Sequence, residues 1–383
     1  MHIGFDGKRI FQNQTGLGNY ARSLVQGLAT QYPQQQYSLF TPKQTTLFDA
    51  EKYNNINVKL PVTLIDKKLP GLWRRSRMVK DIAAAKLDIF HGLSNELPAG
   101  IEKIDAKSVI TVHDLIFERY PETYHWDQRY THRWKMKKSC EVADAVIAAS
   151  IQTKKDLQQF YQIPADKIFV CYQNCSPLFQ QQIAADEKQR IKIKYNLPDQ
   201  FFLFVSSITQ RKNLITVCKA LLQLKDSVTI PLVVIGDGKK DKALVKDFIN
   251  TNSLQQRVIF LNEMPVAREA GFTQSIDFPA IYQQAYALIY PSFFEGFGIP
   301  LLEAMWSGLP VICSKASSLP EVGGDAVLYF SPGDADVLCH QMAELTADPN
   351  LYQSLKEKGF IQANHFTAAK HAEAVMNVYK ALE

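Results

Sequence analysis

The sequence lacks several features that would assign it to a particular class of protein. None of its 383 residues belongs to a run approaching the roughly 20 consecutive apolar residues of a membrane-spanning helix. The six cysteines form no CxxC pair of the metal-binding kind. No basic stretch followed by an apolar one opens the chain, so we expect no secretory signal. These absences argue against an integral membrane protein and a disulfide-stapled miniprotein, and favour a protein of a reducing cytoplasm.

The composition is that of a soluble globular protein. Hydrophobic residues make up 46% of the chain and charged residues 21%, which excludes a disordered or collagen-like chain. The length predicts two or three domains. The net charge of +5 is unevenly divided, because residues 1–185 hold 24 Lys and Arg against 17 Asp and Glu, whereas residues 186–383 hold 19 against 21. The first half therefore carries +7 and the second −2, which predicts an anionic partner for the first half: a membrane, a phosphate or a nucleic acid.

Short apolar runs alternate with helix-like stretches along the whole chain, which predicts α/β layers with parallel sheets. Strands are expected at 2–6, 37–41, 87–91, 108–112, 145–149, 168–172, 201–206, 231–235, 257–261, 286–290, 310–314 and 327–330. Helices are expected at 18–31, 73–85, 128–143, 151–161, 212–225, 239–251, 277–285, 299–307, 333–347, 350–363 and 367–382. The polar segment 180–198 interrupts this pattern and predicts a domain boundary. We therefore expect two doubly wound domains, with ligands at the carboxyl ends of their strands and a cleft between them.

A glycine-rich segment opens the first long predicted helix. Gly16 and Gly18 fit G-x-G-x-x-A, and such glycines let the backbone approach a phosphate at a helix N-terminus. An NAD-binding interpretation is weakened because the glycines come well after the strand, and because Thr41-Pro42-Lys43 supplies no carboxylate for a ribose. A loop facing a phosphate or sugar is favoured, and a glycine turn that only starts a helix remains an alternative.

Two further strand-to-helix junctions carry charged residues. The segment 207–213 contains the adjacent cations Arg211 and Lys212, which suit a diphosphate, although charged loop residues are often only solvated. The segment 286–314 places Glu295 in a glycine-flanked loop and Glu303 in the following helix. Two carboxylates can serve a glycosidase, but an anion-binding loop between them favours a phosphorylated sugar. In the structural alternative, Glu295 caps the helix and Glu303 is a surface residue.

Two histidines end apolar strands in the first half. His113 is followed by Asp114, and we favour a functional role for it over a structural one. His91 precedes Gly92 in a similar position. It can line an acceptor site or be structural, and the sequence does not choose between these.

With Glu295 and Glu303 in this arrangement, the sequence resembles retaining glycosyltransferases of family 4, which have the GT-B fold. Glu295 and Glu303 reproduce the E-x7-E motif of that family within the block 291–312. The resemblance extends over nearly the whole chain through four shorter motifs, TGLGNYA at 15–21, VHD at 112–114, RKN at 211–213 and VVIGDG at 233–238. It implies two Rossmann-like domains facing each other across a cleft, the first comprising 1–185 with 366–383 as a returning helix and the second 186–365.

The resemblance also implies how the donor diphosphate is held. Arg211 and Lys212 match the basic pair that neutralises the diphosphate as it departs, so no metal and no other cofactor is expected. Gly16 and Gly18 match the loop that closes over the phosphates. This chain has Ser207 where the family commonly supplies a second diphosphate-binding residue, so only a hydroxyl is available there.

For the sugar, the resemblance implies that His113 contacts it at the reacting face, and that Glu303 binds the ribose hydroxyls of the nucleotide. The transferred sugar itself is held by Glu295 together with the backbone of Phe297, Gly298 and Ile299. His113 and Glu295 are therefore the expected catalytic residues. The loop 262–275 is longer than usual beside the base, which leaves the nucleotide open.

The sequence says least about the acceptor, the molecule that receives the sugar. Residues 66–86 are typical of an interfacial helix, because they combine cations with a tryptophan and other apolar residues. The cations are Lys67, Lys68, Arg74, Arg75, Arg77 and Lys80, and the apolar residues are Leu69, Leu72, Trp73 and Met78. We therefore expect peripheral contact with the inner face of a membrane through 66–86. A solvated basic surface and a phosphate-binding acceptor groove remain equal alternatives. The run Lys135–Lys138 is interpreted as plain helix surface.

Taken together, the sequence predicts a cytoplasmic, metal-independent, retaining hexosyltransferase. It would move a sugar, mannose or glucose, from a nucleoside diphosphate sugar to a hydroxyl of a saccharide or lipid-linked acceptor. A sugar-nucleotide epimerase of the same fold is the nearest alternative, and an NAD-dependent oxidoreductase is a weaker one. Nucleic acid is not an expected partner, because the basic half contains no recognition module.

Overall fold

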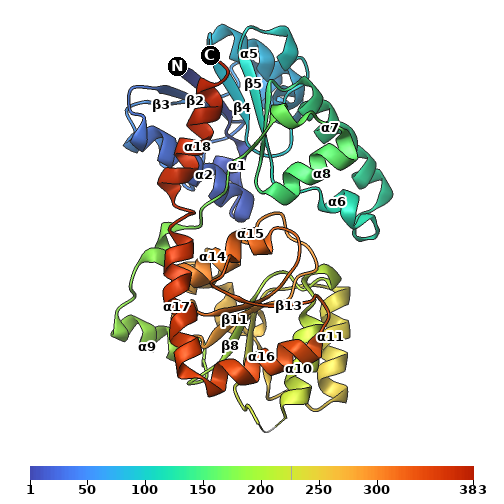
Figure 1. The fold of residues 1–383 in the computed structure, drawn as a ribbon. Helices are drawn as coiled ribbons and strands as arrows, with labels where there is room; N and C mark the ends of the chain where they lie inside the picture. Colours follow the sequence, from blue (N-terminus) through green and yellow to red (C-terminus); the bar gives the residue numbers. More distant parts are fainter. Residues whose placement is uncertain (226) are drawn as a thin grey trace. The chain divides into compact units, whose positions relative to one another are not determined.

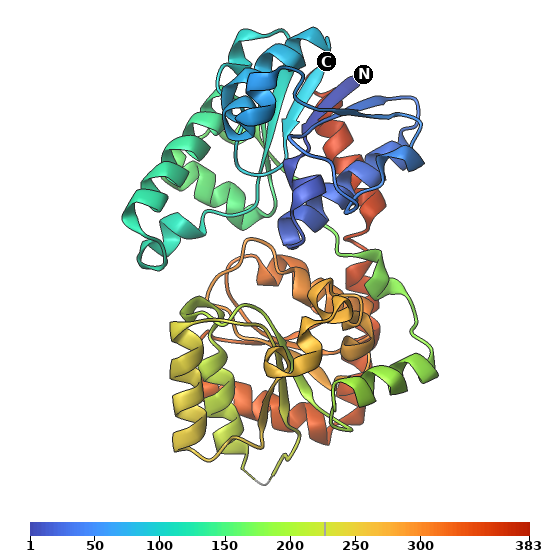
Figure 2. The same ribbon diagram turned by 180° about the vertical axis from the view of Figure 1, so that it is seen from behind.

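The computed structural model describes residues 1–225 and 227–383, which form two compact units (Figure 1). The first unit comprises Met1–Asn174 and Phe366–Glu383, and the second comprises Cys175–His365. The chain thus enters the second unit earlier than the predicted boundary at 185/186. Its two ends lie close together in the first unit, because the C-terminal helix returns there (Figure 2).

The first unit is built on a parallel sheet of seven strands in the order β3-β2-β1-β4-β5-β6-β7. Its strands are β1 (His2–Asp6), β2 (Gln36–Phe40), β3 (Ile56–Lys59), β4 (Ile89–Gly92), β5 (Lys107–Val112), β6 (Ala145–Ala148) and β7 (Ile168–Val170). Its helices are α1 (Lys8–Gln12), α2 (Gly16–Gln31), α3 (Leu64–Lys68), α4 (Pro70–Leu72), a π-helical turn at Trp73–Arg77, α5 (Met78–Ala84), α6 (Ile116–Arg119), α7 (Trp126–Val142), α8 (Ile151–Tyr161) and α18 (Ala368–Lys380).

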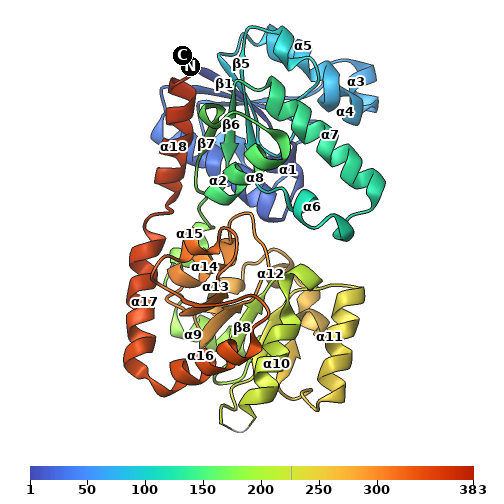
Figure 3. The same cartoon turned by 45° about the vertical axis from the view of Figure 1, so that its right-hand side comes forward.

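Apolar side chains cover both faces of this sheet, as expected for parallel strands buried on two sides. In β5, Val109 belongs to one buried cluster and Ile110 to the other, because successive side chains point to opposite faces. The first cluster joins α2 to α18, whose residues Val375 and Met376 are fully buried (Figure 3). The C-terminal helix is therefore part of the core of the first unit.

The second unit is built on a parallel sheet of six strands in the order β10-β9-β8-β11-β12-β13. Its strands are β8 (Phe202–Val205), β9 (Leu232–Ile235), β10 (Val258–Phe260), β11 (Ala287–Tyr290), β12 (Val311–Ser314) and β13 (Leu328–Phe330). Its helices are α9 (Ala185–Lys194), α10 (Leu214–Leu224), α11 (Lys240–Thr251), α12 (Ala270–Thr273), α13 (Phe278–Tyr282), α14 (Ile299–Trp306), α15 (Leu319–Gly323), α16 (Ala335–Ala347) and α17 (Pro349–Ala363).

Every expected strand is present, and every expected helix overlaps a helical segment. The segment 180–198 was predicted to interrupt the pattern at a domain boundary, whereas it lies inside the second unit, which begins at Cys175. It contains helix α9, which buries Ile191 and is fixed at its end by Tyr195, whose Oη donates to Asp277 at 2.7 Å. The edge strand β3 and the short helix α1 were not expected.

The segment 66–86 also differs from the single interfacial helix that was predicted. Trp73 is fully buried, and its Nε1 donates to Asp81 at 2.6 Å. Arg74 forms ion pairs with Asp6 at 2.6 Å and with Glu96 at 3.0 Å. The tryptophan and the central arginine of the segment therefore stabilise the first unit instead of facing a membrane. Over the described residues, no helix is both long and apolar enough to cross one.

Candidate functional site

The second sheet has a topological switch point between β8 and β11. Strand β8 pairs with β9 on one side and β11 on the other, so the connections that leave β8 and β11 run to opposite sides of the sheet. Ligands of open α/β sheets bind in the crevice at the carboxyl ends of such strands. The segments 206–213 and 291–298 begin there, which places the two charged sequence motifs side by side.

Hydrogen bonds join these two segments to each other. The backbone N–H of Phe293 donates to the carbonyl oxygen of Arg211 at 2.8 Å, and the Arg211 side chain donates to the carbonyl of Phe294 at 2.5 Å. Asn213 has left-handed backbone geometry, with φ of 58°, and its side chain donates to the carbonyl of Pro291 at 3.1 Å. Asn tolerates this geometry better than most residues, which accounts for the third position of the RKN motif.

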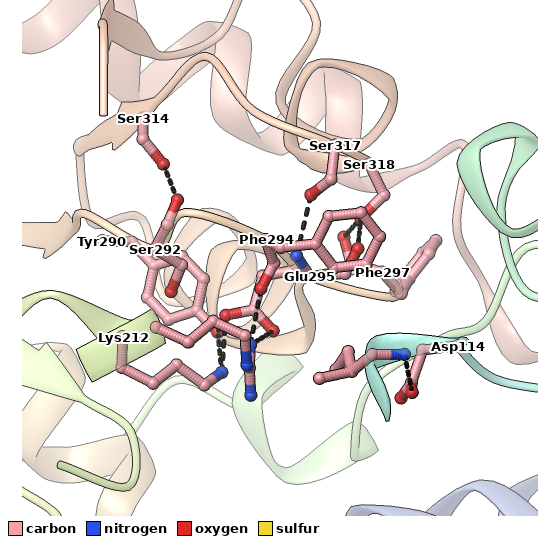
Figure 4. A network of polar contacts seen from close by, with 12 residues as sticks. Asp114, Lys212, Tyr290, Ser292, Phe294, Glu295, Phe297, Ser314, Ser317 and Ser318 are labelled. Carbon is pink, nitrogen blue, oxygen red and sulfur yellow. Dashed lines mark hydrogen bonds and ion pairs between the residues drawn. The ribbon is translucent and has the colours of Figure 1, made fainter. Parts of the chain in front are cut away.

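Glu295 lies at the centre of a buried charge cluster, shown in Figure 4. Its Oε1 accepts from Lys212 Nζ at 2.5 Å and from Tyr290 Oη at 3.0 Å, and its Oε2 lies 3.5 Å from Arg211 Nη1. Burial opposes the charged form of the carboxyl, but Lys212 and Arg211 outweigh it and hold the pKa of Glu295 below its ordinary value. The cluster is therefore a carboxylate with two cations and a phenol.

Two serines between β12 and α15 hold the backbone around Glu295 through hydrogen bonds. The N–H of Glu295 donates to Ser317 Oγ at 2.8 Å, and Ser318 Oγ donates to the carbonyls of Glu295 at 3.0 Å and Phe297 at 2.9 Å (Figure 4). Gly298 follows with φ of 112°, a conformation that a side chain would strain, and a Cβ there would lie 2.8 Å from Leu319. These contacts hold the backbone of the loop that leads from Glu295 to α14.

Helix α14 begins at Ile299 without a side-chain cap, because its N-cap residue is Gly298. The alternative in which Glu295 caps this helix is therefore wrong. An uncapped helix N-terminus presents positive potential and attracts oxygen-rich ligands. On the next turns of the helix, Glu303 Oε2 accepts from Tyr282 Oη at 2.9 Å. Burial raises the pKa of Glu303 to about 7, and the Tyr282 hydrogen bond opposes this only in part.

The two glutamates of the motif therefore differ in charge state. Glu295 is ionised by neighbouring cations, whereas Glu303 has a neutral partner and titrates near neutral pH. Ser207 is exposed in the turn after β8, so its hydroxyl is accessible at the same edge of the sheet. Among the described residues, no group of three or more His, Cys, Asp or Glu could hold a metal ion.

In the first unit, His113 follows β5 at the carboxyl edge of the sheet and is 6% exposed. Its Nε2 lies 3.0 Å from the carbonyl oxygen of Leu93, which can only accept, so Nε2 carries the proton. Its Nδ1 then accepts from the side-chain amide of Gln173 at 3.2 Å. Burial lowers the pKa of His113 to about 4, so the imidazole is neutral at physiological pH.

His91 is structural. It is fully buried in β4, with Nδ1 2.6 Å from Tyr379 Oη and Nε2 2.8 Å from Thr111 Oγ1. These bonds connect the sheet to α18, and burial lowers the pKa of His91 to about 3. Its alternative role of lining the acceptor side is not compatible with complete burial.

The two glycines of the first helix have different surroundings. A Cβ on Gly18 would lie 1.9 Å from the carbonyl oxygen of Asn13, so this position requires glycine for packing alone. The Asn13 side chain also accepts from the N–H of Gly18 at 3.2 Å and of Thr15 at 2.8 Å. A Cβ on Gly16 would meet nothing within 4 Å, and this residue is exposed. Gly16 is thus the member of the pair that a ligand can approach.

Several side chains that organise the site had not been singled out in the sequence. They are the partners of predicted residues: Gln173, Tyr282, Tyr290, Ser317 and Ser318. Tyr290 ends an apolar strand immediately before the glutamate loop, which is a local signal for it. The others are distant in sequence from the side chains they contact, so no spacing rule reveals them.

Comparison with known proteins shows to which family the chain belongs. Residues 15–173 match the model described as Glycosyltransferase Family 4, and residues 185–362 match that of Glycosyl transferases group 1. The O-antigen chain mannosyltransferase B of Escherichia coli is 27% identical over the whole of both chains. The Escherichia coli serotype-specific mannosyltransferase WbdA is 27% identical over 82% of this chain but only 39% of its own length.

Among solved structures, Anabaena Alr3699/HepE in complex with UDP and glucose superimposes with a TM-score of 0.71. The alignment covers 99% of both chains at 15% identity, so this likeness shows the fold alone, which is GT-B. The two family matches, which together span nearly the whole chain, confirm the resemblance carried by Glu295 and Glu303. The chain belongs to glycosyltransferase family 4, whose members take nucleotide sugars as donors and retain the anomeric configuration of the transferred sugar.

Proposed function

We propose that this enzyme transfers a hexose, with mannose as the first candidate, from a nucleoside diphosphate sugar to a hydroxyl of a growing saccharide or lipid-linked saccharide. Polysaccharide biosynthesis in the cytoplasm is the corresponding role. The observation that carries the proposal is the buried cluster of Arg211, Lys212 and Glu295 at the switch point of the second sheet. The mannosyltransferase to which the chain is similar over its full length supports the choice of sugar.

The donor diphosphate is assigned to Arg211 and Lys212. Arg211 offers a planar set of N–H donors and Lys212 a compact charge, and both are held at a strand-to-helix junction. Two fixed cations can neutralise the charge that develops on the leaving diphosphate, which is the task a divalent ion performs elsewhere. Metal-independent transfer follows from this assignment. The Ser207 hydroxyl and the backbone at Gly16 are assigned further contacts to the phosphates, while Gly18, which is buried, allows the turn that presents Gly16.

The sugar and ribose are assigned to the glutamate loop and α14. Glu295 and the backbone of Phe297, Gly298 and Ile299 bind the hydroxyls of the transferred sugar. Glu303 accepts from the ribose hydroxyls, as a carboxylate does in other Rossmann-like domains. Tyr282 leaves one carboxylate oxygen of Glu303 for this contact, since its hydroxyl bonds to Oε2.

The chemical step forms a bond between the acceptor oxygen and the anomeric carbon, and breaks the bond from that carbon to the diphosphate oxygen. Both events occur on the same face of the sugar, so configuration is retained. The acceptor proton passes to the departing phosphate oxygen, and no protein base is required. His113 suits this scheme because it is neutral and its Nδ1 and Nε2 both have partners. It contacts the sugar as a positioned dipole and does not act as a general acid.

A panel of sugar nucleotides tests the proposal. GDP-mannose, UDP-glucose and UDP-galactose are compared by thermal stabilisation and by transfer to a mannose-terminated acceptor, with and without EDTA. We expect one sugar nucleotide to stabilise the protein and to yield an α-linked product in EDTA. Glu303→Ala should mainly weaken donor binding, and His113→Ala should mainly slow turnover.

The same panel distinguishes the alternatives. A change in the sugar nucleotide without any acceptor would identify an epimerase. Stabilisation by NAD and by no sugar nucleotide would contradict the transferase. If Glu303→Ala changed neither donor affinity nor turnover, the site assignment would be wrong.

A further inference from the structure

Helix α7 carries an exposed row of aromatic side chains. Trp126, Tyr130 and Trp134 are 76%, 69% and 56% exposed. Their spacing of four residues places them on one face of the helix, each about one turn from the next. Large aromatic side chains contribute most when they are buried, so three in a row facing water indicate a surface that becomes covered.

A second exposed apolar group lies at 60–72 in the same unit. Its members are Leu60, Val62, Leu64, Ile65, Leu69 and Leu72, with exposures between 46% and 77%. Together with the α7 row they make up nine of the 18 exposed large hydrophobic residues found among the described residues. Half of the exposed hydrophobic side chains thus fall in two short stretches of the first unit.

The two stretches adjoin each other. A hollow is lined by Arg75 on one side and by Trp134 and Lys138 of α7 on the other, and Arg75 follows Leu72 by less than one helical turn. Helices α3, α4 and α7 lie on the same side of the first unit in two views (Figures 2 and 3). We call the surface formed by 60–72, Arg75 and the exposed side of α7 the α7 face.

The α7 face is basic. Helix α7 contains Arg129, Arg133, Lys135, Lys137 and Lys138 against Asp127 and Glu141. Some of these cations already have acidic neighbours: Arg129 and Arg133 contact Glu118, Lys135 contacts Glu96, and Lys137 contacts Glu141. Arg75, Lys67 and Lys68 add positive charge beside the apolar group, and Lys138 lies over the Trp134 ring at 5.5 Å from its centroid.

We propose that the α7 face docks on the surface of an anionic phospholipid bilayer. Tryptophan and tyrosine favour the boundary between headgroups and acyl chains, and lysine and arginine next to them bind anionic headgroups. The aromatic row enters the boundary with the long axis of α7 parallel to the membrane, while the cations stay among the headgroups.

A second copy of the chain fits this surface less well. A two-fold contact would place the same basic residues of two molecules against each other, and like charges repel. The excess of seven positive charges in residues 1–185 favours a negatively charged partner in the same way. The inference does not depend on the donor or acceptor, because it rests on the exposed surface of the first unit alone.

The membrane contact is therefore assigned to a different part of the first unit from the predicted segment 66–86. Of the segment 66–86, only Leu69, Leu72 and the cations near them belong to the α7 face, since Trp73 and Met78 are fully buried. The aromatic anchors come from α7, whose run Lys135–Lys138 was interpreted as plain helix surface. Each anchor is supplied by a regular helix, so its position is fixed by backbone geometry.

Vesicle flotation tests the proposal with the full chain. Vesicles of pure phosphatidylcholine are compared with vesicles containing 30% phosphatidylglycerol, at low and high salt. We expect binding to the anionic vesicles only, weakened by high salt because exposed charges are screened. The variant Trp126→Ser/Tyr130→Ser/Trp134→Ser should bind about tenfold more weakly or worse, since it removes the apolar anchor.

A matched control variant keeps the test specific. Ile193→Ser/Leu244→Ser/Ile361→Ser removes three comparably exposed apolar side chains from the second unit, which are 71%, 60% and 67% exposed. It should float like the unchanged protein. Both variants replace exposed residues, so equal thermal unfolding temperatures would exclude misfolding as the cause of lost binding.

Three outcomes would overturn the proposal. The first is undiminished flotation of the α7 variant, and the second is equal loss in the control variant. The third is an absence of vesicle binding together with a concentration-dependent dimer that the α7 variant abolishes, which would make the α7 face an interface between copies. Quenching of tryptophan fluorescence by brominated lipids adds a direct measure, because Trp126 and Trp134 should be quenched while the buried Trp73 is not.

Discussion

The two units share the strand order around their switch points but differ in the side chains at the carboxyl ends of the two central strands. In the second unit, Glu295, Lys212 and Arg211 form a cluster of formal charges with little exposure. In the first unit, the histidines at the ends of β4 and β5, His91 and His113, are neutral, and the charge of Asp6 at the end of β1 is already paired with Arg74. The cations of a charged cluster can bind an anionic ligand in place of their carboxylate partner. Neutral side chains can only orient a ligand through hydrogen bonds.

This difference shows where the chemistry is specified. Both sheets have a switch point between their first and fourth strands in chain order, so each fold offers a crevice. The residues that follow the strands decide what the crevice binds. Charge suits the unit that is proposed to bind a diphosphate, and neutral hydrogen bonding suits the unit that is proposed to contact an uncharged sugar. Substitutions that change one electrostatic character into the other test this comparison.

The largest effect is expected from Lys212→Met. The change leaves the Glu295 carboxylate buried with Arg211 as its remaining cationic neighbour. Removing one partner of a buried ion pair lowers the free energy of unfolding by about 3–5 kcal/mol, because the other charge is left buried. Turnover should fall by about a thousandfold, because one of the two cations that are proposed to stabilise the leaving diphosphate is lost. Urea unfolding and steady-state kinetics measure the two effects.

The double variant Lys212→Met/Glu295→Gln is the control for stability. Removing both charges should restore most of the unfolding free energy, since no unpaired charge remains, but it should not restore turnover. A Lys212→Met protein that is as stable as the unchanged enzyme would show that Arg211 alone satisfies Glu295. The two units would then differ less than the geometry indicates.

An intermediate effect is expected from pH, through Glu303. Its pKa is raised to about 7 by burial, and in the proposed complex the ribose hydroxyls donate to its ionised form. Donor binding must therefore displace a proton below pH 7, so affinity should fall by about tenfold for each pH unit below 7 and level off above it. The phosphates of a sugar nucleotide stay ionised in this range, whereas a nucleoside diphosphate would itself titrate. Calorimetry with the sugar nucleotide between pH 5.5 and 8.5 measures the slope.

Glu303→Gln provides the matched control for this prediction. The amide keeps the shape and one acceptor oxygen but cannot ionise, so donor affinity should be lower at pH 8 and nearly independent of pH. A pH slope that persists in Glu303→Gln would assign the titration to another group. Glu303 would then be a structural partner of Tyr282.

Local patterns predicted the strands and the charged loops of the second unit correctly, because the signal for each lies in a few consecutive residues. Apolar runs such as 286–290 become β11, and the glycines around Glu295 mark the loop that follows. Strand β3 was missed because it is short and lies at the edge, so only part of it is apolar. Helix α9 was not expected within the polar segment 180–198, because Ile191 is the only residue of the helix that is buried.

Side-chain partners could not be predicted, since they depend on tertiary structure. Lys212 and Glu295 are 83 positions apart, and each was assigned to a ligand without the other being considered. The burial of Trp73 and Arg74 is another case, because Asp6 and Glu96, which pair with Arg74, come from distant parts of the chain. A basic segment containing a tryptophan looks the same in sequence whether it faces water or its own core.

The smallest effect is expected at Gln173, the side chain that donates to His113 Nδ1. Gln173→Ala removes one hydrogen bond to a neutral group, so turnover should fall only several-fold, in line with about 1 kcal/mol for such a bond. Gln173→Glu is nearly isosteric, yet its carboxylate accepts where the amide donates. It should draw a proton to Nδ1 and raise the pKa of His113 from about 4, because an opposite charge nearby favours the imidazolium.

That substitution converts the neutral site of the first unit into a charged one, and its signature lies in the pH profile. The unchanged enzyme should show no His113 ionisation between pH 5.5 and 8.5, whereas Gln173→Glu should add an inflection in kcat within that range. Turnover should be lower on the acidic side, where His113 is charged, and should recover as pH rises and the proton is lost. Histidine ring NMR on the same variant reports the protonation state directly. An unaltered pH profile with normal stability would mean that Gln173 only packs against His113 and that the neutrality of this site is maintained by burial alone.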